Sequence, residues 1–174
     1  TRPATTPATP RIVRKAPPVA ILGGAGFVGA NLADALMREG NDVVVLDNLS
    51  RPGVERNLSW LASRHGSRLQ SVPGDIRDGK AVADVVQGAA AVYHLAAQVA
   101  VTSSLIDPQD DFAVNAQGTL NVLEAVRLHA PETPVIFAST NKVYGNLADV
   151  ALHEEDDRYV ATQPKLRERG IDEQ

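Results

Sequence analysis

The sequence predicts an α/β protein built on a doubly wound parallel sheet, because three observations agree. Short apolar runs alternate with helical stretches from residue 19 onward. Each run is apolar throughout, as expected when helices cover both faces of a parallel sheet. A glycine-rich turn separates the first apolar run from the first helix. Right-handed crossovers would place such strands side by side in one sheet.

The predicted elements follow one another in chain order. Strands are expected at 19–23, 42–47, 68–75, 91–96 and 134–140, and helices at 27–39, 54–65, 79–86 and 109–130. The polar segment HEEDD at 153–157 is expected to be a solvated turn. We found no internal repeat that would suggest a different architecture.

The first eighteen residues differ in composition from the rest of the chain. They contain five of the eleven prolines and four basic residues but no acid, so we expect a disordered tail over 1–18. Residues 19–174 are then expected to form one dinucleotide-binding domain. The basic start also resembles a transit peptide, although its prolines disfavour an amphipathic helix.

Charge and composition exclude several classes of function. The whole chain has a net charge of −4 and the tail has +4, which leaves −8 on the remainder and argues against nucleic-acid binding. The absence of cysteine excludes disulfides and thiolate metal sites and fits a cytoplasmic protein. The four histidines are too scattered to predict a metal site, and His94, inside an apolar run, is expected in the core. No apolar run approaches the roughly 20 residues of a membrane span.

The turn in ILGGAGFVGANLADAL carries the strongest chemical signal. Gly23, Gly24, Gly26 and Gly29 lie between a predicted strand and a predicted helix, and Asp47 ends the next strand eighteen residues later. This context is the dinucleotide-binding pattern of a Rossmann fold, in which the glycines let the backbone approach a pyrophosphate at a helix N-terminus. An acid at Asp47 would accept hydrogen bonds from the adenosine ribose and repel a 2′-phosphate, which favours NAD over NADP. Arg51 keeps the NADP alternative open.

Two more strand ends point to the same crevice. Asp75 and Ile76 follow the third strand and are placed for the adenine edge and face. Small residues after the fourth strand would let the backbone lie along the cofactor. The candidate cofactor-binding residues are Gly23, Gly26, Phe27, Val28, Gly29, Asp47, Asn48, Ser50, Arg51, Asp75, Ile76, Leu95, Ala96, Ala97 and Gln98.

The segments GGAGFVG, DNLSR, GDIRD, VYHLAAQ, NAQGTLNVLEAVR and STNKVYG together resemble the extended short-chain dehydrogenase/reductase family of nucleotide-sugar epimerases and dehydratases. RPGVERNLSWL and the Asn141–Lys142 pair look most like its CDP-paratose 2-epimerase branch. The resemblance implies that Asp47 and Asn48 contact the adenosine ribose. It also implies that Thr140 is the catalytic hydroxyl that hydrogen-bonds the reacting sugar.

The chemistry implied by this resemblance is transient oxidation of a sugar carbinol by NAD, followed by return of the hydride to the other face of the ketone. The family's base is the tyrosine of a Tyr-x-x-x-Lys motif, which this sequence does not contain. Lys142 and Tyr144 are two residues apart and lack the helical spacing of that pair. The chain is therefore expected to be the N-terminal portion of a longer protein, truncated before that motif and before a substrate domain.

Three functions remain open at this point. The first is part of a nucleotide-sugar epimerase, with a CDP-sugar favoured as substrate. The second is part of a UDP-sugar 4-epimerase or a dTDP-sugar 4,6-dehydratase, and the third is a non-catalytic NAD-binding module. In the 109–130 helix, Val114, Leu120, Leu123 and Val126 form an apolar stripe and Val122 and Leu128 lie partly off it. A second apolar edge could pack against another copy of the chain, and the resemblance implies a homodimer through such a helix. The alternative is that all of these residues face the sheet.

Overall fold

The computed structural model of the chain describes residues 16–171. These residues divide into two compact units, one that ends at Ala138 and one that begins at Ser139, and each is described by itself. Most of the predicted tail, residues 1–15, lies outside the described residues.

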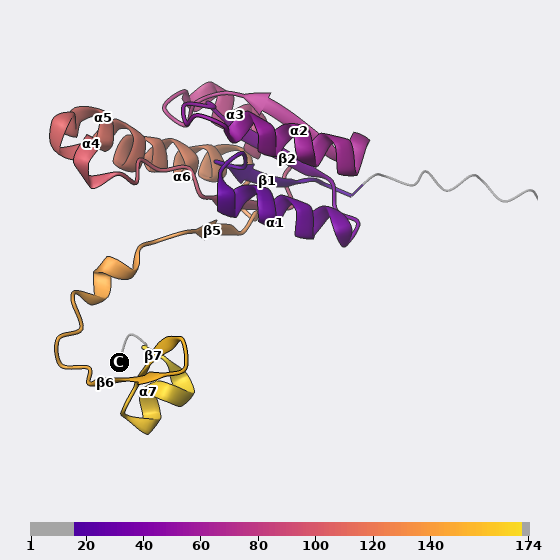
Figure 1. Cartoon of the computed structure of the whole chain (residues 1–174). Coiled ribbons are helices and arrows are strands. Elements are labelled where there is room, and N and C mark those ends of the chain that lie inside the picture. The colour runs from indigo at the N-terminus through magenta and orange to yellow at the C-terminus, as the bar shows by residue number, and fades with distance from the viewer. Residues whose placement is uncertain (1–15, 172–174) are drawn as a thin grey trace, which may run out of the picture. The chain divides into compact units, whose positions relative to one another are not determined.

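The first unit contains a parallel sheet of five strands (Figure 1). The strands are β1 (Val19–Leu22), β2 (Val43–Asp47), β3 (Leu69–Pro73), β4 (Ala91–His94) and β5 (Val135–Phe137), in the order β3-β2-β1-β4-β5. This is the beginning of the 3-2-1-4-5-6 order of a Rossmann fold. The predicted fold class and all five strands are confirmed.

Helices cover both faces of the inner strands (Figure 1). Helices α1 (Phe27–Arg38) and α2 (Val54–His65) pack with Ile21 and Val45 on one face. Helices α3 (Gly79–Val86) and α6 (Gly118–His129) pack with Leu22 and Val44 on the other. Successive side chains of a strand point to opposite faces, so an uninterrupted apolar run fills both cores. Together these cores fix the carboxyl ends of β1 and β2 side by side, where Leu22 pairs with Leu46.

The edge strands depart from the prediction that both faces of every strand would be covered. Gln70 and Ser71 of β3 are exposed, and so are Ile136 and Phe137 of β5. An edge strand has a neighbour on one side only, so its burial depends on fewer packed elements than that of β1 or β2.

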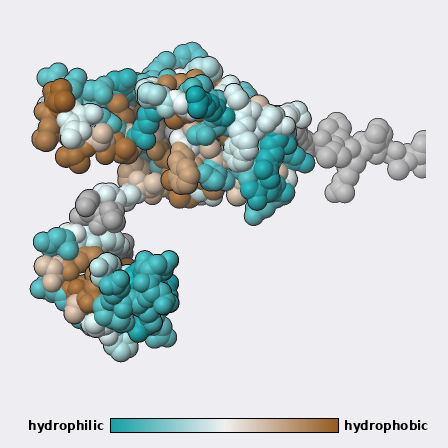
Figure 2. All heavy atoms as spheres, viewed as in Figure 1, coloured by the Kyte–Doolittle hydropathy of each residue, from teal (hydrophilic) through white to brown (hydrophobic). Residues whose placement is uncertain are grey.

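The helix predicted at 109–130 is divided in the structure. Helix α4 (Val101–Ile106), which was not predicted from the sequence, is followed by α5 (Pro108–Phe112), a π-helical turn (Ala113–Gln117) and α6. Asp107 begins α5 by accepting a hydrogen bond from the Asp110 amide, with proline in the first turn. Apolar side chains gather on the exposed surface over α4 and α5, among them Leu105, Ile106 and Phe112 (Figure 2). None of the described helices is both long enough and apolar enough to cross a bilayer.

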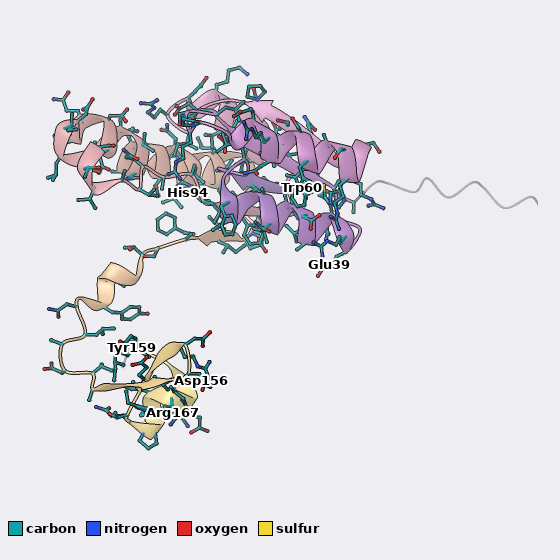
Figure 3. All side chains as sticks on the ribbon, in the orientation of Figure 1. Glu39, Trp60, His94, Asp156, Tyr159 and Arg167 are labelled. Atoms are coloured by element: carbon teal, nitrogen blue, oxygen red, sulfur yellow. The ribbon has the colours of Figure 1, made fainter. Side chains whose placement is uncertain are left out.

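The second unit contains secondary structure where only a polar turn was expected. Strands β6 (Leu152–Glu155) and β7 (Arg158–Ala161) pair as an antiparallel hairpin, and α7 (Pro164–Arg169) follows. A short 3₁₀ helix, η3 (Asn141–Tyr144), precedes them. Arg167 of α7 forms an ion pair with Glu155 at 2.8 Å, and Figure 3 labels this arginine. The prediction of a turn over 153–157 was therefore wrong for the residues in β6, because strands this polar lack the apolar pattern that reveals most strands.

Candidate functional site

A pocket of about 500 Å³ lies at the carboxyl ends of the strands in the first unit. All the predicted cofactor-binding residues line it, although their role as ligands stays a prediction. The pocket is also lined by residues that no sequence pattern predicted, namely Leu46, Val54, Gly74, Arg77, Val99, Asp110 and Val114. Thr140, the predicted catalytic residue, belongs to the second unit and is exposed, and its catalytic role stays a prediction.

Gly23 forms the tight turn at the end of β1. Its φ of +83° is rarely adopted by residues with side chains, and a Cβ there would lie 2.6 Å from the backbone nitrogen of Ala96. Its amide donates to the Leu46 carbonyl at 2.8 Å, which joins the turn to the end of β2. The fold itself therefore requires glycine at this position.

Gly26 has the opposite environment. Its φ is −66°, and a Cβ there would meet only the Gly23 carbonyl oxygen, at an ordinary distance of 3.5 Å. The packing of the chain therefore does not require glycine here. The side of Gly26 where a side chain would lie is open and faces the pocket. This is the cradle that a pyrophosphate would occupy in the dinucleotide-binding pattern.

The N-terminus of α1 adjoins this cradle. Gly26 caps the helix without a side-chain hydrogen bond, and the first turn carries no acidic residue. The backbone amides of the first turn are thus left available to a ligand, at the positive end of a twelve-residue helix. Backbone amides and a helix dipole favour an anion at this position.

Asp47 fixes the glycine-rich turn by hydrogen bonds and can still accept further hydrogen bonds from a ligand. Its Oδ2 accepts from the amide of Ala25 at 2.9 Å and its Oδ1 from the amide of Leu49 at 2.9 Å. A carboxylate offers about four lone-pair sites, so two of these bonds leave each oxygen able to accept one more. The geometry suits the two hydroxyls of a ribose.

Asp75, after β3, is bonded differently. Arg77 donates to it from its backbone amide, Nε and Nη2, and Asn48 adds a fourth hydrogen bond at 2.8 Å. These bonds fill the carboxylate, and those from Arg77 are the main reason that the pKa of Asp75 is held well below its usual value. Arg77 also reaches Asp110 of α5 at 2.6 Å. An adenine ring that hydrogen-bonded to Asp75 would therefore have to displace one of the donors from Arg77 or Asn48.

Side chains remote in sequence fix the loop after β4. Asn115, in the π-helical turn, accepts from the amide of Gln98 and donates to its carbonyl, each at 2.9 Å. Arg51 donates to the Ala97 carbonyl at 3.1 Å, which links the loops after β2 and β4. Asn115 is the first residue of the segment NAQGTLNVLEAVR that carries the family resemblance. Its spacing in the sequence did not predict a contact with Gln98.

His94 lies in the core, as the sequence predicted, at the end of β4 (Figure 3). Its Nε2 lies 2.9 Å from the Thr119 hydroxyl, which itself donates to the Asn115 carbonyl. The ring therefore donates from Nε2, and its buried Nδ1 has no protein partner. Burial lowers the pKa of His94, so the neutral form is favoured. Within residues 16–171, no group of three or more histidines and acids is placed to hold a metal ion.

The fold and this pocket define an α/β protein of the Rossmann type with a crevice at the switch point of its sheet. Its sequence matches the family described as GDP-mannose 4,6 dehydratase over residues 20–164, so the chain belongs to that family. It is 42% identical over 155 residues to CDP-paratose 2-epimerase from Salmonella typhi, covering 88% of this chain and 44% of that protein. It is 39% identical over 129 residues to a dTDP-glucose 4,6-dehydratase from Mycolicibacterium smegmatis, covering 73% of this chain and 37% of the relative.

Solved structures agree with this assignment. UDP-glucose-4-epimerase from Stenotrophomonas maltophila, with bound NAD and formylated UDP-arabinopyranose, superposes with a TM-score of 0.69 at 30% identity, covering 76% of this chain and 39% of that one. UDP-glucose 4-epimerase from Thermus thermophilus, in complex with NAD, gives a TM-score of 0.59 at 36% identity over 70% of this chain and 37% of that one. The chain therefore spans less than half the length of these relatives.

Proposed function

We propose that this chain is the NAD-binding part of a nucleotide-sugar epimerase of the CDP-paratose 2-epimerase type. The observation that carries the proposal is the cradle at Gly26, which the packing of the fold leaves open at the N-terminus of α1. Gly26, Phe27 and Val28 would hold the pyrophosphate, and Asp47 the adenosine ribose. Solved relatives with NAD and the 42% identical CDP-paratose 2-epimerase support this choice.

The cofactor preference follows from Asp47. Its carboxylate retains acceptor sites for ribose hydroxyls and would repel the 2′-phosphate of NADP. Titration of the chain with NAD and NADP should show tighter binding of NAD. Asp47→Ala should weaken NAD binding by about tenfold or more, since it removes charged hydrogen bonds. Tighter binding of NADP, or unchanged NAD binding by the variant, would contradict the assignment.

The proposed reaction requires residues beyond the pocket. NAD would supply a hydride acceptor for a sugar carbinol and a hydride donor for the resulting ketone. Thr140 would hydrogen-bond the reacting sugar hydroxyl, in a longer protein that carries the Tyr-x-x-x-Lys motif. The cytoplasm is the proposed location, because a chain without cysteine needs no oxidising compartment.

An activity assay tests the sugar chemistry separately from cofactor binding. The 174-residue chain and a form extended to include the tyrosine motif would be incubated with CDP-paratose and NAD. Only the extended form should turn over, and its Thr140→Ala variant should lose about 100-fold or more if the hydroxyl assists proton transfer. Turnover by the 174-residue chain, or a fully active variant, would refute the role of Thr140. Activity on a UDP- or dTDP-sugar alone would replace the proposed substrate.

A homodimer through α6 is also proposed. Val122, Ala125 and Val126 face the core, whereas Leu120, Leu123 and Leu128 are 51%, 51% and 59% exposed. Leu120 and Leu123, which share the predicted stripe with Val126, are therefore on the exposed side of α6 together with Leu128, whereas Val122 is buried. Sedimentation should detect a dimer that a Leu123→Glu variant weakens, and a monomer at high concentration would exclude it.

A further inference from the structure

We infer that Asn57 of α2 is a positioning residue that holds the glycine-rich turn in its binding conformation. This inference rests on the proposed function, because it concerns the same pocket. Asn57 does not line the pocket. Its side-chain amide instead donates to the carbonyl of Ala25 at 2.7 Å, across thirty-two residues of sequence.

Ala25 is held on both sides by side chains. Its amide donates to Asp47 Oδ2 at 2.9 Å, and its carbonyl accepts from Asn57. Ala25 is fully buried, and it lies between Gly23 and Gly26. Asp47 thus holds the peptide group between Gly24 and Ala25, and Asn57 holds the one between Ala25 and Gly26. A buried polar atom that loses its partner is costly, so the two side chains together favour one orientation of this turn.

The orientation of the peptide group between Ala25 and Gly26 matters for binding because it leads directly into the first amides of α1. Gly26 follows Ala25 directly and caps the helix, and the amide of Ala30 donates to the Gly26 carbonyl at 2.9 Å. A turn that rotates about Ala25 would shift the open side of Gly26. Asn57 would therefore affect the pyrophosphate-binding half of the pocket without touching a ligand.

The position of Asn57 is itself well supported. It lies in the first half of α2, one residue before Leu58, which packs against the core formed by α1, α2 and the sheet. Arg51, just before the helix, donates to the Ala97 carbonyl. The segment from Arg51 to Asn57 thus attaches the loops after β1 and β4 to α2.

The test compares Asn57→Ala and Asn57→Asp with Asn41→Ala. Asn41 is a matched control because its side-chain amide also donates to a backbone carbonyl, that of Leu36 at 3.0 Å, outside the pocket. Amide hydrogen exchange of the ligand-free chain is the first readout. Both Asn57 variants should accelerate exchange of the Ala25 amide by about tenfold relative to the amides of Ile21 and Val45, because loss of the bond to the Ala25 carbonyl loosens the turn in which this amide is bonded to Asp47. Asn41→Ala should not.

Ligand titration is the second readout. The Asn57 variants should bind NAD about tenfold more weakly and bind adenosine, which has no pyrophosphate, within about twofold of the original chain. Unchanged exchange at Ala25, or equal acceleration at all three amides, would overturn the inference, and so would equal losses for NAD and adenosine. If the original chain bound no NAD, the proposed function would fail, while exchange at Ala25 would still decide the role of Asn57.

Discussion

The turn after β1 and the loop after β3 line the same pocket but are held together in different ways. At the turn, Gly23 and Gly29 pack so closely that a Cβ would clash with backbone, and Ala25 is fully buried. After β3, charged side chains bond to one another, and 42% of the Arg77 side chain and 25% of the Asp75 side chain are exposed. Steric contacts in a packed interior tolerate little change, whereas exposed ion pairs contribute little to stability. We therefore expect substitutions at the turn to have larger effects than those in the loop.

The largest expected effect is that of Gly23→Ala on stability. The variant combines a left-handed φ with a Cβ placed 2.6 Å from the Ala96 nitrogen. Strain and overpacking together should cost roughly 2 to 4 kcal/mol in urea unfolding. Gly88→Ala is the matched control, because Gly88 has a φ of +77° but nothing within 4 Å of the added Cβ. Equal losses in the two variants would show that the close approach to Ala96 is not a constraint.

Gly26→Ala should separate binding from stability. The added Cβ meets only the Gly23 carbonyl at 3.5 Å, so unfolding should change by no more than about 1 kcal/mol, the cost of alanine at a helix N-cap. Affinity for NAD should fall by about tenfold or more, because the methyl group occupies the proposed pyrophosphate cradle. Gly79→Ala, at the start of α3 with only Asn121 nearby, serves as a control that should leave affinity unchanged. A Gly26 variant that binds NAD normally would remove the main support for the cofactor site.

The same difference explains what the sequence could predict. The glycines of the turn matter because they have no side chain. Their spacing relative to β1, α1 and Asp47 can be read from the sequence, so the turn was predictable. The apolar runs likewise predicted the strands, most directly the buried β1 and β2, because strands covered by helices on both faces need apolar residues throughout. The bonds from Asn57 to Ala25 and from Asn115 to Gln98 were not predictable, since each joins residues far apart in the chain. The hairpin β6–β7 was missed for a different reason, because its strands are polar and mostly exposed.

Arg77→Ala should have the smallest effect on stability and a clear effect on titration. Arg77 holds the pKa of Asp75 well below its usual value, so this carboxylate stabilises the folded chain above the unfolded pKa of about 3.9 and loses that contribution as the pH falls below it. Without the Arg77 side chain, the pKa of Asp75 should rise toward that value, because burial raises the pKa while only the amide of residue 77 and Asn48 still lower it.

The measurement is an NMR titration of the Asp75 carboxyl, combined with urea unfolding at pH 6 and pH 3. Because the pair is partly exposed, the stability difference between the two proteins at pH 6 should stay below about 1 kcal/mol. This stability difference should become smaller at pH 3. Below its unfolded pKa, Asp75 is largely protonated in the unfolded chain, so the low pKa in the folded chain contributes less to the stability of the original protein. Arg127→Ala removes the exposed pair with Glu124 on α6 and should leave the Asp75 titration unchanged. If Asp75 in the original chain titrates near its usual pKa, the pair with Arg77 does not hold the loop after β3. The difference in rigidity between this loop and the closely packed glycine-rich turn would then be larger than the hydrogen bonds of the loop suggest.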